Sequence, residues 1–474
     1  NKIAYELRDR RLIMREYLTI ERVEAKKRLV VERTKDFGEI YEVFDKSEAA
    51  TQSERCIQCG DPFCLNKCPL HNYIPQWLKA VSEKDLEFAF KLSNEPSPFP
   101  EVMGRVCPHD RLCEGDCTLN DGHGAITIGS VETHITEEGF KAGYKPEFPG
   151  ITTDKKVAII GSGPAGLSAA TYLLRSGIAV TMYERSDRAG GLLTYGIPNF
   201  KLDKKIVERR VKYLIEAGME LVLECEVGKD ITFEEIADKH DAMFIGVGAT
   251  KAKKASLNGE QAPNVYRAMD YLTAIQRKNF KLSYDKKFNF REKNVVVIGG
   301  GDTAMDCLRT AKREGAKSVT CLYRRDAHNM PGSQKEYKNA MEEGVDFTFF
   351  VSPKEIILND KGNAIAVELI KTTLGTKDES GRQKIEEIKG SEYRVSADVI
   401  IMSLGFNPEI PSFLAENGIE TNKWGGIIIN EKTHETTTAG IYAGGDCYRG
   451  ADLVVTAAYD GREAARSIVK SLLK

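Results

Sequence analysis

The chain has 474 residues, 41% of them hydrophobic, so it is long enough to form two to four domains and to enclose large cofactors. Its 68 Lys and Arg nearly balance its 70 Asp and Glu, and this argues against nucleic acid or an anionic membrane as the main partner. No run approaches the roughly 18 apolar residues of a membrane span, and residues 1–20 are too charged for a secretory signal, so we expect a cytoplasmic location.

The first 150 residues are predicted to form a helical domain. Residues 1–45 are rich in charge with scattered apolar positions such as Leu18 and Leu29, which predicts exposed helical arms. From residue 56 to about residue 144, Pro and Gly separate short segments, a pattern typical of a small helical domain folded around ligands. Residues 145–150 then form a linker rich in Pro and Gly.

Seven of the eleven Cys cluster in this domain, and in a reducing compartment such clustering indicates metal binding before disulfides. They are Cys56, Cys59, Cys64, Cys68, Cys107, Cys113 and Cys117. Closely spaced Cys with a further Cys before Pro are typical of four-iron clusters. Structural zinc and unliganded thiols are the alternatives, but zinc prefers two Cys pairs per ion and seven thiols do not divide into fours.

Two four-iron clusters need eight ligands, so one ligand must come from outside the seven Cys. Glu132 is a candidate from its position after the Cys segment, and His109, His123 and His134 are further candidates.

A nucleotide fingerprint follows the linker. Residues 156–160 form an apolar strand, and Gly161, Ser162, Gly163, Pro164, Ala165 and Gly166 then open a helix. Such glycines permit a tight turn and a close approach of the backbone to a pyrophosphate at the helix N-terminus. The next strand ends at Glu184 and Arg185, and an acid in this position can accept hydrogen bonds from a ribose diol.

Other segments complete the expected FAD site. Gly191, Leu192, Gly196 and Ile197 lie in a segment where the backbone passes close to a large ligand. Near the C-terminus a buried strand runs into Asp446, and a helix that contains Thr456 follows. An acid at that strand end suits a ribityl hydroxyl, so we expect an FAD domain in two parts, residues 151–288 and 406–474.

A second copy of the fingerprint predicts an NADPH domain at residues 289–405. The strand 294–298 leads into Gly299, Gly301, Asp302 and Thr303. The following strand ends in Arg324 and Arg325, and guanidinium groups there bind the 2′-phosphate of NADPH through paired hydrogen bonds. Asp326 weakens this preference slightly, because it could turn toward a ribose.

The remaining Cys give no outlet for electrons at the flavin. Flavoproteins that reduce disulfides need a Cys pair, whereas Cys225, Cys307, Cys321 and Cys447 are isolated in sequence. Electrons are therefore expected to leave through the N-terminal Cys domain.

From about Asp36 onward the chain closely resembles the small (beta) subunit of NADPH-dependent glutamate synthase. The motifs that carry the resemblance are Cys68-Pro-Leu-His-Asn-Tyr-Ile-Pro75, Gly104-Arg-Val-Cys-Pro108, Leu112-Cys-Glu-Gly-Asp-Cys-Thr-Leu-Asn120, Gly299-Gly-Gly-Asp-Thr-Ala-Met-Asp-Cys307, Tyr323-Arg-Arg-Asp326 and Met330-Pro-Gly-Ser333. The charged first 35 residues do not match the family's usual start. They are interpreted as a lineage-specific tail, with a partner-binding arm as the alternative.

The resemblance implies an α/β fold with two Rossmann-like domains, for FAD and NADPH, arranged as in adrenodoxin-reductase-like flavoproteins. A helical domain with two 4Fe-4S clusters precedes them. Cys56, Cys59, Cys64 and Cys117 would hold one cluster; Cys68, Cys107, Cys113 and Glu132 would hold the other. NADPH would reduce FAD by hydride transfer without a protein acid or base, and the clusters would pass single electrons to a large FMN-containing iron–sulfur subunit for glutamate synthesis.

Two other functions stay open at this stage. One is the large subunit of a ferredoxin:NADP oxidoreductase, possibly electron-bifurcating, which shares the architecture. The other is a non-catalytic assembly scaffold, which the intact Gly and Cys motifs disfavour.

Overall fold

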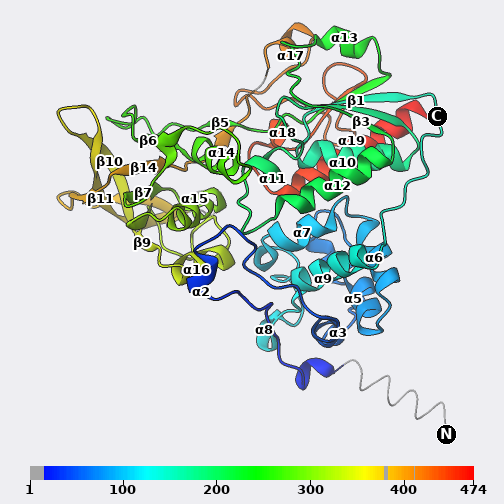
Figure 1. Ribbon diagram of the computed structural model, residues 1–474, viewed down its shortest axis with the longest axis horizontal. Helices are drawn as coiled ribbons and strands as arrows, with labels where there is room; N and C mark the ends of the chain where they lie inside the picture. Colours follow the sequence, from blue (N-terminus) through cyan, green and yellow to red (C-terminus); the bar gives the residue numbers. More distant parts are fainter. Residues whose placement is uncertain (1–14, 378–382, 410, 474) are drawn as a thin grey trace.

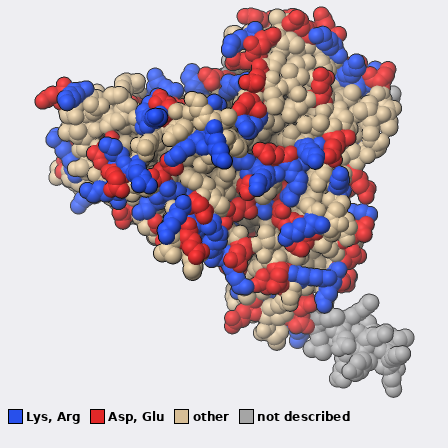
Figure 2. All heavy atoms as spheres, viewed as in Figure 1, with Lys and Arg blue, Asp and Glu red and all other residues tan. Residues whose placement is uncertain are grey.

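The computed structural model describes residues 15–377, 383–409 and 411–473. Figure 1 shows a helical unit that contains the N-terminal part of the chain, and two α/β units packed beside it and beside each other. Basic and acidic side chains are interspersed over the face seen in Figure 2. No helix among the described residues is both long and apolar enough to cross a bilayer.

The N-terminal segment, residues 15–45, differs from the expected exposed helical arms. It contains only a short 3-10 helix, η1 (Glu16–Leu18), and one turn of helix, α2 (Val30–Arg33). Arg33 and Ile40 are each 1% exposed, because the segment packs between the helical unit and the second α/β unit (Figure 1). The prediction was wrong because the side chains that cover this segment lie far away in sequence. Positions before residue 15 lie outside the described residues.

The helical unit consists of short helices around one apolar core. Its helices are α3 (Lys46–Glu54), α4 (Phe63–Lys67), α5 (Ile74–Ser82), α6 (Leu86–Asn94), α7 (Pro100–Val106), η2 (His109–Arg111), α8 (Asn120–His123) and α9 (Ile128–Lys141). Asp45 begins α3 with a capping box that includes Glu48. Trp77 and Ile135, both fully buried, bring α5 and α9 into the shared core.

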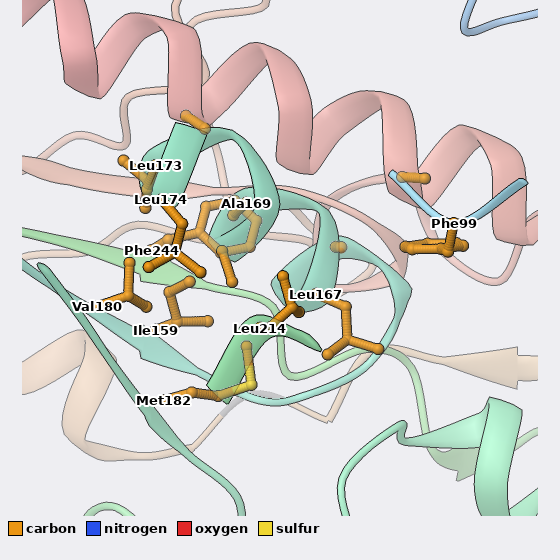
Figure 3. Close-up of a cluster of buried hydrophobic side chains, with 14 of the residues drawn as sticks. Phe99, Ile159, Leu167, Ala169, Leu173, Leu174, Val180, Met182, Leu214 and Phe244 are labelled. Atoms are coloured by element: carbon orange, nitrogen blue, oxygen red, sulfur yellow. The ribbon is translucent and has the colours of Figure 1, made fainter. Parts of the chain in front are cut away.

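The first α/β unit has a five-stranded parallel sheet in the order β16-β4-β1-β2-β3. Its strands are β1 (Lys156–Ile160), β2 (Ala179–Tyr183), β3 (Met219–Val222), β4 (Ala242–Ile245) and β16 (Ile441–Ala443). Helices α10 (Pro164–Arg175), α12 (Lys204–Glu216) and α19 (Val454–Leu472) pack on it. Figure 3 shows Ile159 and Phe244 of the strands against Leu174 of α10. The remaining elements are α11 (Leu192–Tyr195), α13 (Phe233–Ala237), α17 (Phe413–Glu416) and α18 (Asp446–Arg449).

The second α/β unit repeats this plan, with a parallel sheet in the order β6-β14-β7-β8-β9. Its strands are β6 (Val265–Arg267), β7 (Asn294–Ile298), β8 (Ser318–Tyr323), β9 (Asp346–Phe349) and β14 (Val399–Met402). Its helices are α14 (Ala268–Asn279), η3 (Lys286–Phe288), α15 (Asp302–Arg313) and α16 (Gln334–Glu342). Because β6 and α14 belong to this layer, the unit draws on residues before the expected boundary at residue 289.

An antiparallel sheet and a two-stranded connection complete the second unit. The sheet contains β10 (Val351–Leu358), β11 (Ala364–Lys377), β12 (Gln383–Glu387) and β13 (Tyr393–Ser396). The chain enters the unit through β5 (Lys251–Ala252) and leaves through β15 (Phe406–Asn407), which pair with each other. Two Rossmann-like units after a helical unit confirm the expected α/β fold class.

Candidate functional site

A cavity of about 1530 Å³ lies where the three units meet. Its lining residues come from both sequence segments of the first α/β unit and from the start of α15 in the second unit. The predicted cofactor residues that line it are Gly161, Ser162, Gly163, Pro164, Ala165, Glu184, Arg185, Gly191, Leu192, Ile197, Asp302, Thr303 and Asp446. A cavity of this size and shape can hold an extended dinucleotide.

The first fingerprint has the geometry that its glycines predict. Gly161 turns the chain after β1 with φ of 98°, and a Cβ there would lie 2.6 Å from the carbonyl oxygen of Gly246. Helix α10 then begins at Pro164 and directs its N-terminus at the cavity. Glu184 Oε2 accepts hydrogen bonds from the backbone N of Ser162 at 3.1 Å and from its Oγ at 2.5 Å. The acid at the end of β2 therefore fixes the glycine-containing turn.

Asp446 closes the same cavity from the C-terminal end of the chain. It begins α18 directly after Gly445, and burial raises the pKa of its carboxyl group to about 7. Ile197 and Leu192 line the facing wall. Lys204 supports that wall from behind, since its Nζ donates to three backbone carbonyls, those of Leu193, Ile197 and Leu202.

Some predicted residues of the FAD site do not line the cavity. Gly166 lies on the inner side of α10, where a Cβ would come within 2.0 Å of the Gly161 carbonyl oxygen, so it allows the helix to pack on the turn. Gly196 lies behind Leu192. The Thr456 hydroxyl donates a hydrogen bond to the backbone carbonyl of Leu453 at 2.8 Å, at the start of its own helix α19.

The second fingerprint reaches the cavity through Asp302 and Thr303, whereas Gly299 and Gly301 are not among its lining residues. The two arginines after β8 also differ. Arg324 is exposed, but Arg325 is 6% exposed and donates Nη2 to the backbone carbonyl of Gln383 at 3.0 Å. A phosphate at this strand end is therefore more accessible to Arg324.

The sequence reasoning missed a third glycine-containing loop. Gly246, Gly248 and Ala249 follow β4 and line the cavity beside the first fingerprint. The signal was present, because residues 242–245 are a short apolar run that ends in Gly-Val-Gly-Ala-Thr. Tyr284 and Lys287 also line the cavity, and they carry no motif that could have identified them.

The seven clustered Cys and Glu132 separate into two groups, each around its own small cavity. Cys56, Cys59, Cys64 and Cys117, here called the outer quartet, line a cavity of about 20 Å³. Cys68, Cys107, Cys113 and Glu132, the inner quartet, line one of about 30 Å³. Among the described residues no three His, Cys, Asp or Glu converge closely enough to share a single metal ion. The side chains of each quartet instead surround a space, as the ligands of a multi-atom cluster do.

The chemistry of the inner quartet fits a bound cluster. Burial raises the pKa of Glu132 to about 8 and that of the Cys113 thiol well above its ordinary value, so anionic ligands here need a positive partner. Ser97 Oγ and His109 Nε2 line the same cavity and lack a hydrogen-bond partner within the described part of the chain. Of the three His candidates, only His109 reaches either quartet.

The outer quartet has apolar walls and side-chain donors beside its sulfurs. Gln58 Nε2 donates to Cys56 Sγ at 3.3 Å, and Thr118 Oγ1 lies 3.3 Å from Cys59 Sγ. Burial raises the pKa of Cys56 to about 11. Phe63, in the wall of this cavity, is 53% exposed, so the outer quartet lies close to the surface.

The three cavities lie next to one another in series. Val106 and Pro108 line the large cavity, and Cys107 between them lines the inner one. Ile128 lines both the inner and the outer cavity. The order of neighbouring cavities is therefore the large cavity, the inner quartet, and then the outer quartet near the surface.

Comparisons with known proteins agree with this arrangement. Residues 33–144 match the family described as dihydropyrimidine dehydrogenase domain II, 4Fe-4S cluster, and residues 155–461 match the pyridine nucleotide-disulphide oxidoreductase family. The glutamate synthase [NADPH] small chain of Halomonas elongata is 47% identical over 463 residues, which cover 96% of this chain and 98% of that protein. The putative oxidoreductase AegA of Escherichia coli is 46% identical over 95% of this chain and 70% of its own length.

A solved structure supports the fold of the two α/β units. Mycobacterium tuberculosis FprA in complex with NADPH aligns with a TM-score of 0.57, over 68% of this chain and 85% of that one, at 19% identity.

Proposed function

This chain belongs to the family of NADPH-dependent glutamate synthase small chains, and we propose that it is the subunit that oxidises NADPH for a large FMN-containing partner. It is an NADPH-dependent oxidoreductase that uses FAD and 4Fe-4S chemistry. The large partner, rather than this chain, would carry out the synthesis of glutamate.

The residues suit these cofactors in the following way. The first fingerprint, Glu184 and Asp446 would hold FAD, and Asp302, Thr303 and Arg324 would hold NADPH. The inner and outer quartets would hold one 4Fe-4S cluster each. When bound, these groups supply hydride transfer from the nicotinamide to the flavin and single-electron transfer onward.

The protein's own contribution is positioning and exclusion of water. Val106 and Pro108 separate the large cavity from the inner quartet, and Ile128 separates the two quartets with an apolar side chain. No side chain needs to donate or accept a proton for hydride transfer, so we assign no acid or base. The observation that carries the proposal is that the three cavities adjoin, at residues 106–108 and at Ile128, which would give a short route from the flavin to the surface.

Composition and reduction of the purified protein test the proposal. We expect FAD, close to eight irons and eight acid-labile sulfides per chain, and bleaching of the flavin by NADPH. Cys113→Ser should lower iron and sulfide, leave flavin reduction by NADPH intact and stop transfer to the large subunit. A preparation with zinc and without sulfide, or undiminished transfer in the variant, would contradict the proposed route.

The match to AegA favours a second candidate, an oxidoreductase of the same architecture with another electron acceptor. Its identity to this chain is within one percentage point of that of the Halomonas small chain. Co-purification decides between them: a large FMN-containing subunit supports the first candidate, and a different acceptor supports the second.

A further inference from the structure

A buried chain of polar side chains leads from Trp77 to Glu132. Trp77 Nε1 donates to Asn72 Oδ1 at 3.2 Å, and Asn72 Nδ2 donates to Glu132 Oε1 at 2.7 Å. Trp77 is fully buried, and Asn72 and Glu132 are each 5% exposed. All three line the inner cavity. Since bulk water does not reach these groups, protein contacts fix their orientation.

The donors and acceptors define the direction of every bond in this chain. The indole of Trp77 can only donate, so the amide atom that faces it must be the oxygen of Asn72. The amide nitrogen therefore faces Glu132 and donates its hydrogen bond to Oε1. The second carboxylate oxygen, Oε2, accepts no hydrogen bond from the residues that the structure describes. Glu132 thus has one oxygen held by protein and one free on the inner cavity.

Asn72 also contacts a second member of the inner quartet. The backbone N–H groups of Leu70 and Asn72 lie beside the Cys68 thiol, and the backbone N–H of His71 donates to the Cys68 carbonyl at 2.8 Å. Between Leu70 and Asn72, His71 has φ of 49°, a left-handed conformation that a non-glycine residue rarely adopts. This turn brings the backbone of Asn72 to Cys68 and its side chain to Glu132, which comes from the distant helix α9.

We propose that Asn72 is a positioning residue that directs Glu132 Oε2 toward the non-Cys corner of the inner cluster, with Trp77 holding the amide in place. This inference rests on the cluster assignment in the proposed function. It gives a physical role to Asn72 and Trp77 beyond packing, because without the amide the carboxylate loses the one hydrogen bond that it accepts from the described part of the chain, and with it its defined rotamer. Outer partners of this kind typically change metal affinity by about 10- to 100-fold.

The test compares Asn72→Leu with a matched control, Asn94→Leu. Asn94 is also 5% exposed in the same unit, donates to the Phe90 carbonyl at 2.9 Å and accepts from Arg210 Nη2 at 3.1 Å. Each variant therefore removes two hydrogen bonds from a buried amide, but only Asn72 contacts the inner quartet.

Iron release from the intact protein is the measurement. One-electron oxidation by ferricyanide, with loss of one Fe²⁺, converts a 4Fe-4S cluster to a 3Fe-4S cluster that is visible by electron paramagnetic resonance. We expect Asn72→Leu to form this signal about 10- to 100-fold faster than the wild type, and Asn94→Leu to match the wild type. In a Glu132→Ala background, Asn72→Leu should add no further acceleration, because Asn72 acts through Glu132.

Trp77→Phe keeps an aromatic ring and removes the indole donor together with part of the ring volume, and it is the second variant if Asn72→Leu does not fold. It should accelerate iron release in the same direction by a smaller factor. Wild-type release rates in both variants, with both clusters present, would overturn the role of Asn72 while leaving the proposed function intact. Wild-type protein without iron and sulfide would overturn the proposed function itself.

Discussion

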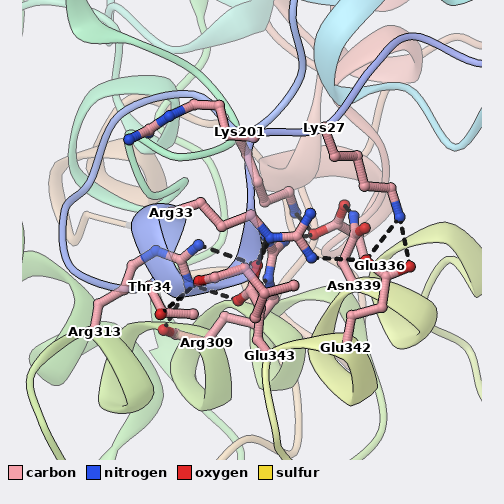
Figure 4. A network of polar contacts seen from close by, with 12 residues as sticks. Lys27, Arg33, Thr34, Lys201, Arg309, Arg313, Glu336, Asn339, Glu342 and Glu343 are labelled. Atoms are coloured by element: carbon pink, nitrogen blue, oxygen red, sulfur yellow. Dashed lines mark hydrogen bonds and ion pairs between the residues drawn. The ribbon is translucent and has the colours of Figure 1, made fainter.

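The substitution Glu343→Ala tests the packing of the second α/β unit most directly, because the Glu343 carboxylate is the centre of a buried group of charges. It is fully buried and pairs with Arg309 Nη2 at 2.8 Å and with Arg313 Nη1 at 2.6 Å, both on α15. Arg33 of the N-terminal segment lies 3.3 Å from it (Figure 4). Burial raises the pKa of Glu343, but the guanidinium groups of Arg309 and Arg313 lower it further, to below its ordinary value.

The cost of Glu343→Ala follows from the partners that remain. Removing one member of a buried ion pair costs about 3–5 kcal/mol when the other is left uncompensated. In the variant, Arg309 still has its ion pair with Glu336, at 2.5 Å, and Arg33 still has its ion pair with Glu342, at 2.7 Å. Only Arg313 loses its acidic partner altogether among the described ion pairs. We therefore expect the lower end of the range, about 3 kcal/mol.

Native-state hydrogen exchange measures this locally, without assuming two-state unfolding of a protein with several domains. Amides of α15 and α16 should exchange about a hundredfold faster in Glu343→Ala. Glu342→Ala is the matched control: its side chain is 42% exposed, and its pairs with Lys27 and Arg33 should contribute at most about 1 kcal/mol. Equal exchange rates in the two variants would refute the assignment of the buried charges.

Three further predictions concern the cofactor cavity and the acid range. Arg324→Ala should weaken NADPH binding about 10- to 100-fold with little effect on NADH, whereas Arg325→Ala should weaken it less, because Arg325 is 6% exposed and Arg324 is exposed. Nucleotide titrations check this, and equal losses for both nucleotides would contradict it. Lys204→Met removes the donor to three backbone carbonyls and should loosen FAD about tenfold or more, measured as flavin retained on dilution. Burial raises the pKa of Glu336, but Arg309 and Lys201 lower it more, to about 2. The ionised Glu336 therefore stabilises the fold fully above about pH 4.5, and this stabilisation is lost as the pH falls toward 2. Glu336→Gln should lack this acid dependence in unfolding titrations.

The sequence predicted those parts of the site whose signals are local. Gly161 and Glu184 stand at strand ends, where the chain itself shows what the backbone must do. The direction of Arg325 was not predictable, because its partner carbonyl lies 58 residues later in β12. The N-terminal segment was misread for the same reason, since Lys27 pairs with Glu342, 315 residues away.

The division of ligands between the quartets has a local cause that the sequence already contained. Cys68 ends α4 and Cys107 ends α7, each in an extended conformation, with ψ of 120° and 140°. Both stand before a proline, and the proline ring disfavours a helical conformation in the residue that precedes it. Each Cys therefore leaves its helix axis at the point where the helix stops, and both turn into the inner cavity. At α7 the same break places Val106 and Pro108 on the large cavity, so one Cys-Pro step supplies a residue of the inner quartet and part of the wall of the large cavity.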